Sequence, residues 1–349
     1  MKRYALSLAA ALAVALAAVG GAAAAVGRQG HSLVPVLGPE PRAWLAALQE
    51  LPTDPARYAL QRAATEHTRR RPQPRHRPRT TTLSIYEHRI HPWILSAQGC
   101  SSARRHESGV VVLDFGKPAY RHGGYGTILF SGRFAKNHAI TVAMLAYAHA
   151  YVRCLPQGST ASIEVARGTS NYHPALPSAY TAGVRWARET NRLGRILGRE
   201  GLDAHVEAAA ADDAEPAWDP GFRRTREFFH GFRAAVHGHT LFDYGSLDGG
   251  VGAIWSARQA WYVSGGLRHT KALPEIYTSA MAQQWAELAR IARSRYRHPV
   301  RFAGVMTQGT SSCTCGLRPP AAHSALARAL SAHGVRNVLL PDGGTSIVG

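Results

Sequence analysis

The sequence predicts an α/β fold in which short strands alternate with helices over about the last 240 residues. Apolar runs of strand length recur there between longer stretches with helical periodicity, which is typical of a parallel sheet wrapped by helices. Seven or eight such units in about 240 residues match a (β/α)8 TIM-like barrel. A doubly wound open sheet is the alternative, but no Gly-x-Gly-x-x-Gly follows any of the runs to indicate a dinucleotide site.

Residues 1–25 have the pattern of a secretory signal peptide. Lys2 and Arg3 precede an Ala-rich apolar run, and small residues at 22–25 provide a cleavage site. We therefore expect a protein that is secreted or cell-wall associated, without membrane contact after signal cleavage. The apolar run is also just long enough to span a bilayer, so a membrane anchor formed by an uncleaved N-terminal segment is the alternative.

Residues 26–80 form the expected N-terminal region, which ends in an Arg/Pro-rich linker. Residues 66–80 contain six Arg, three Pro and no large apolar side chain, so they cannot build a core. An extended, disordered linker is the simplest interpretation. The alternative is an electrostatic contact of Arg69–Arg79 with an anionic wall polymer. No nucleic-acid partner is expected, because no stacking or groove-reading module accompanies the basic segment.

Residues 81–349 form the expected barrel domain. The apolar runs that predict its strands lie at 110–115, 162–166, 205–211, 239–244, 271–277, 301–307 and 337–340. The helical patterns between them lie at 134–152, 180–197, 222–236, 256–263, 280–296 and 321–333. In such a barrel the active site lies at the carboxyl ends of the strands, so the residues after each run are the candidate site residues.

Acidic residues gather at those positions, although the chain has only 22 of them against 41 Lys and Arg. Acidic side chains are poor strand formers and costly to bury unpaired, so their placement calls for an explanation. Neutralisation by nearby Arg would explain any single one, whereas the whole set favours a functional site. The acidic residues in or just after expected strands are Asp114, Glu164, Asp212, Asp213, Glu215, Asp243, Glu275 and Asp342.

Asp213 and Glu215 are the strongest catalytic candidates. They are two residues apart, so an extended backbone points both side chains to one face. Two carboxyl groups facing one cleft can divide glycosidic hydrolysis between a general acid and a nucleophile or base. Trp218 and Tyr244 offer flat rings for stacking on a sugar, although core packing is the simpler explanation for each ring alone. The other candidate substrate-binding residues are Glu164, Glu275, Tyr277 and Gln308.

The four cysteines would face an oxidising compartment after export, which favours pairing. Cys100 precedes the first expected strand and Cys154 precedes the second, so both would lie at one end of neighbouring strands. A disulfide between Cys100 and Cys154 is therefore favoured. Cys313 and Cys315 then form either a strained local bridge or two free thiols. They fall short of a four-ligand zinc site even with a nearby His, and no metal or other cofactor is expected.

The acidic strand ends resemble those of a known family. An Asp ends the first expected strand in Val111-Val112-Leu113-Asp114, and an Asp-x-Glu ends a middle one in Asp213-Ala214-Glu215. Over about residues 105–349 this pattern resembles the family 25 lysozyme-type glycoside hydrolases and related secreted glycoside hydrolase-like barrels of actinobacteria. The resemblance implies a peptidoglycan or other polysaccharide substrate. It also implies Glu215 as proton donor, with Asp213 and Asp114 as electrostatic or substrate-assisting partners.

Two features depart from that family. Asp114-Phe115-Gly116 replaces its Asp-Val-Ser opening, and Pro216 directly follows the expected acid.

Several proteins of the related group are known only as barrels without a demonstrated activity, so a non-catalytic glycan-binding or wall-associated barrel is the alternative function. Esterase, P-loop and zinc-protease chemistry are disfavoured, because Gly-x-Ser-x-Gly, Gly-x-x-x-x-Gly-Lys and His-Glu-x-x-His do not occur.

The formal net charge is +19, of which the first 80 residues carry +8 and the remainder +11. Almost all of the basic excess is Arg, since the chain has only four Lys: Lys2, Lys117, Lys136 and Lys271. An Arg bias of this kind often reflects composition rather than a dedicated ligand, so net charge alone assigns no partner.

Overall fold

The computed structural model describes residues 79–172, 176–296, 298–308, 316–335 and 345–348. They belong to a unit that runs from Arg75 to Gly349. The expected signal peptide, most of the Arg/Pro-rich segment, the expected strand at 337–340, Cys313, Cys315 and Asp342 lie outside the described residues.

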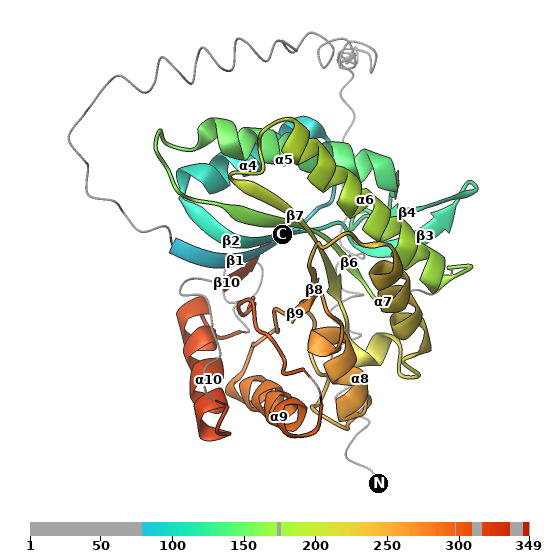
Figure 1. Ribbon diagram of the computed structural model, residues 1–349, viewed down its shortest axis with the longest axis vertical. Helices are drawn as coiled ribbons and strands as arrows, with labels where there is room; N and C mark the ends of the chain where they lie inside the picture. The colour runs from blue at the N-terminus through green and yellow to red at the C-terminus, as the bar shows by residue number, and fades with distance from the viewer. Residues whose placement is uncertain (1–78, 173–175, 297, 309–315, 336–344, 349) are drawn as a thin grey trace, which may run out of the picture. The chain divides into compact units, whose positions relative to one another are not determined.

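A seven-stranded parallel sheet forms the centre of this unit (Figure 1). Apart from β10, neighbouring strands follow one another in the chain, so the connections between them are crossovers over the sheet. This confirms the alternating α/β fold. In spatial order the strands are β10 (Thr345–Val348), β1 (Arg79–Tyr86), β2 (Glu107–Asp114), β6 (Ile163–Ser170), β7 (Val206–Asp213), β8 (Leu241–Asp243) and β9 (Thr270–Ala272).

The sheet curves strongly from its first strand to its last. Beyond β9 it continues as two isolated parallel bridges, Ala272 with Phe302 and Glu275 with Met306. Thr82 of β1 donates a hydrogen bond of 2.6 Å to the carbonyl of Val305, which lies between those bridged residues. In a flat sheet β1 and β9 would lie about 24 Å apart, at about 4.8 Å per strand, so only a curled sheet permits this contact.

Helices lie around the outside of the curved sheet (Figure 1). Ser178 and Thr278 begin two of them by accepting the backbone N–H three residues ahead, and Ser256 begins a third with a full capping box. Proline occupies the first turn of two others, where its missing N–H has no intrahelical partner to lose. The helices are α4 (Pro92–Arg104), α5 (Asn137–Cys154), α6 (Ala179–Arg199), α7 (Arg223–Ala235), α8 (Ala257–Trp261), α9 (Ser279–Arg295) and α10 (Pro319–Ala332).

Strand alternation divides the buried residues between two faces of the sheet. In β2, Val111 and Leu113 pack in the cluster that contains the buried faces of α4 and α5. Val110 and Val112 instead join an inner cluster with residues of β6, β7 and β8 and with Met306. Successive side chains of a strand point to opposite faces, so Asp114 lies on the same face as Val112. The inner face therefore ends in a carboxyl group.

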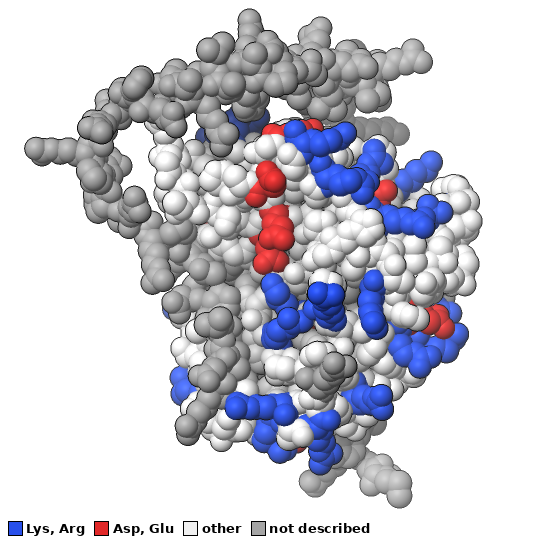
Figure 2. Space-filling view, viewed as in Figure 1, with Lys and Arg blue, Asp and Glu red and all other residues white. Residues whose placement is uncertain are grey.

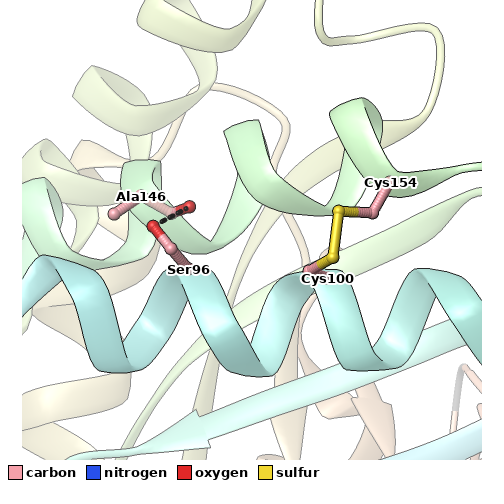
Figure 3. Close-up of a disulfide and its surroundings, with 4 residues drawn as sticks. All are labelled: Ser96, Cys100, Ala146 and Cys154. Atoms are coloured by element: carbon pink, nitrogen blue, oxygen red, sulfur yellow. Dashed lines mark hydrogen bonds between the residues drawn. A yellow bond between two sulfur atoms is a disulfide. The ribbon is translucent and has the colours of Figure 1, made fainter.

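A disulfide joins α4 and α5, and this confirms the expected pairing of Cys100 with Cys154. The two Cα atoms are 5.1 Å apart and the S–S distance is 2.07 Å. Ser96, one turn earlier on α4, donates a hydrogen bond of 3.2 Å to the carbonyl of Ala146 on α5 (Figure 3). Gly99 permits this close approach, because an added Cβ would lie 2.2 Å from the carbonyl oxygen of Tyr147.

The structure also corrects the expected elements. β1 starts at Arg79, so the last two residues of the expected Arg/Pro-rich linker, 79 and 80, belong to the sheet. α4 was not expected, nor was the antiparallel sheet of β3 (Lys117–Arg121), β4 (Gly124–Ile128) and β5 (Phe134–Lys136), which is inserted between β2 and α5. The run at 301–307 is present only as the two bridges, and the run at 271–277 as the short β9 and one of those bridges.

Candidate functional site

Four carboxyl groups come together at the carboxyl ends of the strands. Asp114 ends β2 and Asp213 ends β7. Glu215 follows Asp213 by two residues in extended backbone, and Glu275 follows β9. Their charges act on one another: Glu275, Glu215 and Asp114 each raise the pKa of Asp213. The structure thus brings together the three expected catalytic residues and one of the expected substrate-binding residues.

Burial gives these carboxyl groups an unusual affinity for protons. It raises the pKa of Asp114 to about 7, of Glu215 to about 7 and of Glu275 to about 8. It also raises the pKa of Asp213 well above its usual range. None of the four forms an ion pair with Lys, Arg or His within the described residues. The cluster therefore retains protons near neutral pH and can supply both a donor and an acceptor.

Tyrosine hydroxyls line the same face. Tyr86 is paired in register with Asp114, and its hydroxyl accepts a hydrogen bond of 3.1 Å from Nε2 of Gln308. Tyr277 donates a hydrogen bond to Glu275. Burial, followed by these nearby carboxyl charges, raises the pKa of Tyr86 and of Tyr277. Both hydroxyls therefore stay protonated and can donate to substrate or carboxyl oxygens.

The backbone around Glu215 is held on both sides. The side chain of Asn171, which follows β6, accepts from the N–H of Glu215 at 3.1 Å and donates to its carbonyl at 2.9 Å. Pro216 then begins a single 3-10 turn, Pro216–Trp218, where proline suits the first helical position. Pro216 thus sets the direction of the chain immediately after Glu215.

An open aromatic rim adjoins the cluster. Trp218 is 39% exposed and Tyr172 41% exposed, with their rings 6.3 Å apart and edge to face. The ammonium of Lys117 lies 4.7 Å from the centre of the Tyr172 ring. Trp218 also follows Glu215 by only three residues, and its backbone N–H donates a hydrogen bond of 3.2 Å to the backbone carbonyl of Glu215. Two partly exposed aromatic rings therefore lie in the segments that follow β6 and Glu215.

Two expected substrate-binding residues are placed differently. Glu164 lies near the start of β6, about 20 Å from its carboxyl end at about 3.3 Å per residue, and is 3.6 Å from Nζ of Lys271. Tyr244 is only 1% exposed, and its hydroxyl donates to the carbonyl of Thr169 at 3.0 Å and interacts with Asp114. Glu164 is thus remote from the cluster. Tyr244 is buried against Asp114, so its ring is not available for stacking on a ligand.

Asp212 and Asp243 also lie outside the cluster. They are register partners in β7 and β8 and share the strand face of Ala210 and Leu241, which pack against helices. Ser264 donates a hydrogen bond of 2.5 Å to Oδ2 of Asp243. Burial raises the pKa of both carboxyl groups, to about 7 for Asp243. Two of the eight acidic strand-end residues, Asp212 and Asp243, therefore lie on the other face of the sheet, because adjacent side chains of a strand point to opposite faces.

Several residues at the site were not expected from the sequence. Tyr86 ends β1 and Glu87 follows it, and β1 was not recognised as a strand. Glu87 is 2% exposed, and burial raises its pKa to about 8. Ser246 and Asp248 were missed because they follow a strand in an irregular loop, although Ser246 lies 3.1 Å from Oε1 of Glu215. Ser246 and Asp248 lie within five residues of the end of β8, so counting every polar residue in that span would have found these two.

No group of three His, Cys, Asp or Glu side chains suitable for a metal ion occurs in the described part of the chain. Among the helices of the same residues, none is both long enough and apolar enough to cross a bilayer.

No protein-family model matches the chain, and the comparison with curated proteins returns no match. Fold and geometry together define an α/β protein with a buried acidic site at the carboxyl ends of a curved parallel sheet.

Proposed function

We propose that the chain is an exported glycoside hydrolase-like protein that acts on cell-wall or other polysaccharide by carboxyl acid/base catalysis, similar to the family 25 lysozyme-type enzymes. The observation that carries the proposal is the buried cluster of Asp114, Asp213, Glu215 and Glu275 beside an exposed aromatic rim. Paired carboxyl groups with different surroundings are what glycosidic hydrolysis needs, and flat rings are what hold a pyranose.

Glu215 is the proton donor in this proposal. It adjoins the rim, and its pKa of about 7 keeps a substantial protonated fraction near neutral pH. Its O–H would protonate the glycosidic oxygen as the bond to the anomeric carbon breaks. A water molecule would then add to that carbon and return a proton to the Glu215 carboxylate. Asp213 and Asp114 lie deeper, where an ionised form stabilises positive charge at that carbon or assists the substrate. Glu275 and Tyr277 then act on the hydroxyls of the bound sugar.

The same proposal includes closure of the sheet into an eight-stranded barrel. Residues 302–306 would be the strand between β9 and β10. The two bridges to β9 and the Thr82–Val305 hydrogen bond support this arrangement. The inner cluster supports it too, because Val110 of β2 and Met306 belong to one packed group. Protection of the amides of 302–306 against hydrogen exchange, to the level of β9, is the expected result; exchange at the rate of an open loop would contradict closure.

The catalytic test measures reducing ends released from purified cell wall. Glu215→Gln is isosteric but cannot donate the proton, and we expect a loss of about 10²-fold or more. Glu287→Gln on α9, where the side chain is 48% exposed, is the matched control and should retain full activity. Full activity of Glu215→Gln would sink the assignment. A wild-type protein that is retained on the wall without releasing reducing ends would establish the alternative, a non-catalytic glycan-binding barrel.

Export is part of the proposal and has its own test. N-terminal sequencing of the protein recovered from the culture medium or wall should begin near residue 26. Recovery of the intact N-terminus in the membrane fraction would favour the uncleaved anchor instead.

A further inference from the structure

α6 carries a row of five arginines along one side. They follow one another at intervals of three and four residues, at positions 185, 188, 192, 195 and 199. At 3.6 residues per turn they lie within an arc of about 80°. The buried residues of the helix, such as Trp186 and Leu193, lie on the opposite side. Four of the five arginines are exposed and Arg192 is half-buried.

Composition alone does not account for the row. An Arg-rich composition raises the number of Arg on every exposed helix, but it does not align them along one side. α6 is not the helix richest in Arg: it has five in 21 residues, whereas α7 has four in 13, α9 three in 17, α5 one in 18 and α10 one in 14. The arginines of α7 and α9, however, are spread over an arc of about 180° or more, whereas the five of α6 lie on one side of the helix. Figure 2 shows Lys and Arg side chains gathered over the region of α6 at the upper right of the view. What distinguishes α6 is therefore the alignment of its arginines in one row, not their number.

The row is not neutralised within the described residues. None of the five arginines forms a salt bridge there. The acidic residue of this helix and the one that caps its end have other partners. Glu189 accepts a hydrogen bond of 2.7 Å from Thr141 of α5, and the C-cap Glu200 lies 2.8 Å from Nε2 of His149. Five like charges on about 21 Å of helix repel one another, so an anionic partner would relieve a repulsion that the fold leaves in place.

We propose that the arginine row of α6 is a docking surface for a linear polymer that carries phosphate in its backbone. The row is one side chain wide, and its charges repeat about every 5 Å along the helix. A phosphate backbone carries its charges along the chain axis and can therefore stay within one narrow row. Guanidinium groups also bind phosphate through two parallel N–H bonds.

A bilayer surface fits the row less well. Helices that lie on membranes insert an exposed apolar face, whereas the apolar face of α6 is turned into the core. Tyr180, at the first turn, is the one large apolar side chain of α6 that is prominently exposed. The row therefore has charge for a lipid headgroup but no side chains for the acyl layer.

The test uses the full-length protein, so that the basic N-terminal segment is present in every sample. Binding to long-chain inorganic polyphosphate is compared for the wild type and for the triple variant Arg188→Gln/Arg192→Gln/Arg195→Gln. We expect affinity to fall roughly tenfold or more, and the slope of log K against log salt to fall by about 2. The matched control is Arg290→Gln/Arg295→Gln/Arg328→Gln, which removes the same charge from α9 and α10. It should retain most of the affinity.

Three results would overturn the proposal. The first is equal loss in the two triple variants, which would mean that only net charge matters. The second is affinity for polyglutamate equal to that for polyphosphate. The third is tighter binding to phosphatidylglycerol vesicles than to polyphosphate.

An Arg→Lys triple variant at 188, 192 and 195 keeps the charge and controls for folding. Its affinity should lie between those of the wild type and the Gln variant, because Lys cannot bind phosphate through two parallel N–H bonds.

Discussion

The hydroxyl of Ser246 lies 3.1 Å from Oε1 of Glu215. It also lies 2.8 Å from Oδ1 of Asp248, and one hydroxyl proton cannot serve both carboxyl groups at once. When Glu215 is protonated it can donate to Ser246, which then donates to Asp248. When Glu215 is ionised, Ser246 turns its proton to Glu215. The pKa of Glu215 is therefore sensitive to both neighbours.

The pH profile of the proposed activity should shift in opposite directions in two variants. Glu215 is protonated below its pKa of about 7, so activity falls as pH rises through about 7. The Asp248 charge raises this pKa and the Ser246 hydrogen bond lowers it. Asp248→Asn should therefore move the alkaline limb to lower pH and Ser246→Ala to higher pH, as measured by reducing-end release. If the alkaline limbs of the two variants shift in the same direction, or do not shift, Glu215 is not the proton donor.

The fold should be more stable at mildly acidic than at alkaline pH. Glu87 and Asp243 have folded-state pKa values of about 8 and 7, well above those of an unfolded chain. The folded state therefore holds more protons than the unfolded state between about pH 4 and pH 8, and stability falls as pH rises through that window. Each pKa unit corresponds to about 1.4 kcal/mol. Thermal melts at pH 5 and pH 8.5 measure the difference.

Glu87→Gln isolates one of these groups without touching the proposed catalytic residues. It should raise Tm at pH 8.5 and leave it nearly unchanged at pH 5, since the protonated acid and the amide are both neutral. Glu287→Gln, at an exposed position, should change neither value. A Glu87→Gln protein that is destabilised equally at both pH values would show that this carboxyl group is ionised in the fold.

Trp218→Ala should weaken glycan binding and leave the fold intact. The ring is 39% exposed, so its removal opens no large cavity, and stability should change by about 1 kcal/mol or less. Loss of a stacking surface should raise KM or the dissociation constant for wall fragments several-fold. Trp218→Phe keeps a flat ring and should recover most of the affinity. Unchanged binding in Trp218→Ala would exclude the rim from substrate contact.

Removal of the disulfide should be strongly destabilising. Cys100 and Cys154 are 54 residues apart, and closing a loop of that size lowers the entropy of the unfolded chain by the equivalent of about 4 kcal/mol. Cys100→Ser/Cys154→Ser should therefore unfold at distinctly lower urea concentration than the wild type. Reduction of the wild type should produce the same shift, whereas an unchanged midpoint after verified reduction would refute the estimate.

Two glycines of α6 should respond in opposite ways to the same substitution. A Cβ at Gly183 would lie 2.0 Å from the carbonyl oxygen of Phe228, so Gly183→Ala must push α7 away and should cost several kcal/mol. At Gly198 the nearest atom is Oδ2 of Asp203 at 3.7 Å. Gly198→Ala should be neutral or stabilise by up to about 1 kcal/mol through helix propensity. Urea titrations of both variants check the contrast.

The expected helices and most strands are found close to their expected positions. α6, α7, α9 and α10 begin and end within two residues of the predicted ranges. β1 was missed because its first half, Arg79 to Thr82, is polar and adjoins the Arg/Pro-rich segment. It becomes a strand because β2 and β10 supply its hydrogen bonds from both sides. Such pairing is decided by residues far away in the chain.

The sequence by itself determined that strands alternate with helices and that acidic residues follow the strands, because apolar periodicity and residue identity are local properties. Only the tertiary structure decided which acidic residues share a space. Asp213 reaches the cluster and its neighbour Asp212 does not, since adjacent side chains of a strand face opposite sides. Glu164 is separated from the cluster for another reason, because it lies near the start of β6 and the cluster lies at the carboxyl ends of the strands. The curvature of the sheet, which no local pattern specifies, brings Asp114 and Glu275 to one site although three strands separate β2 from β9.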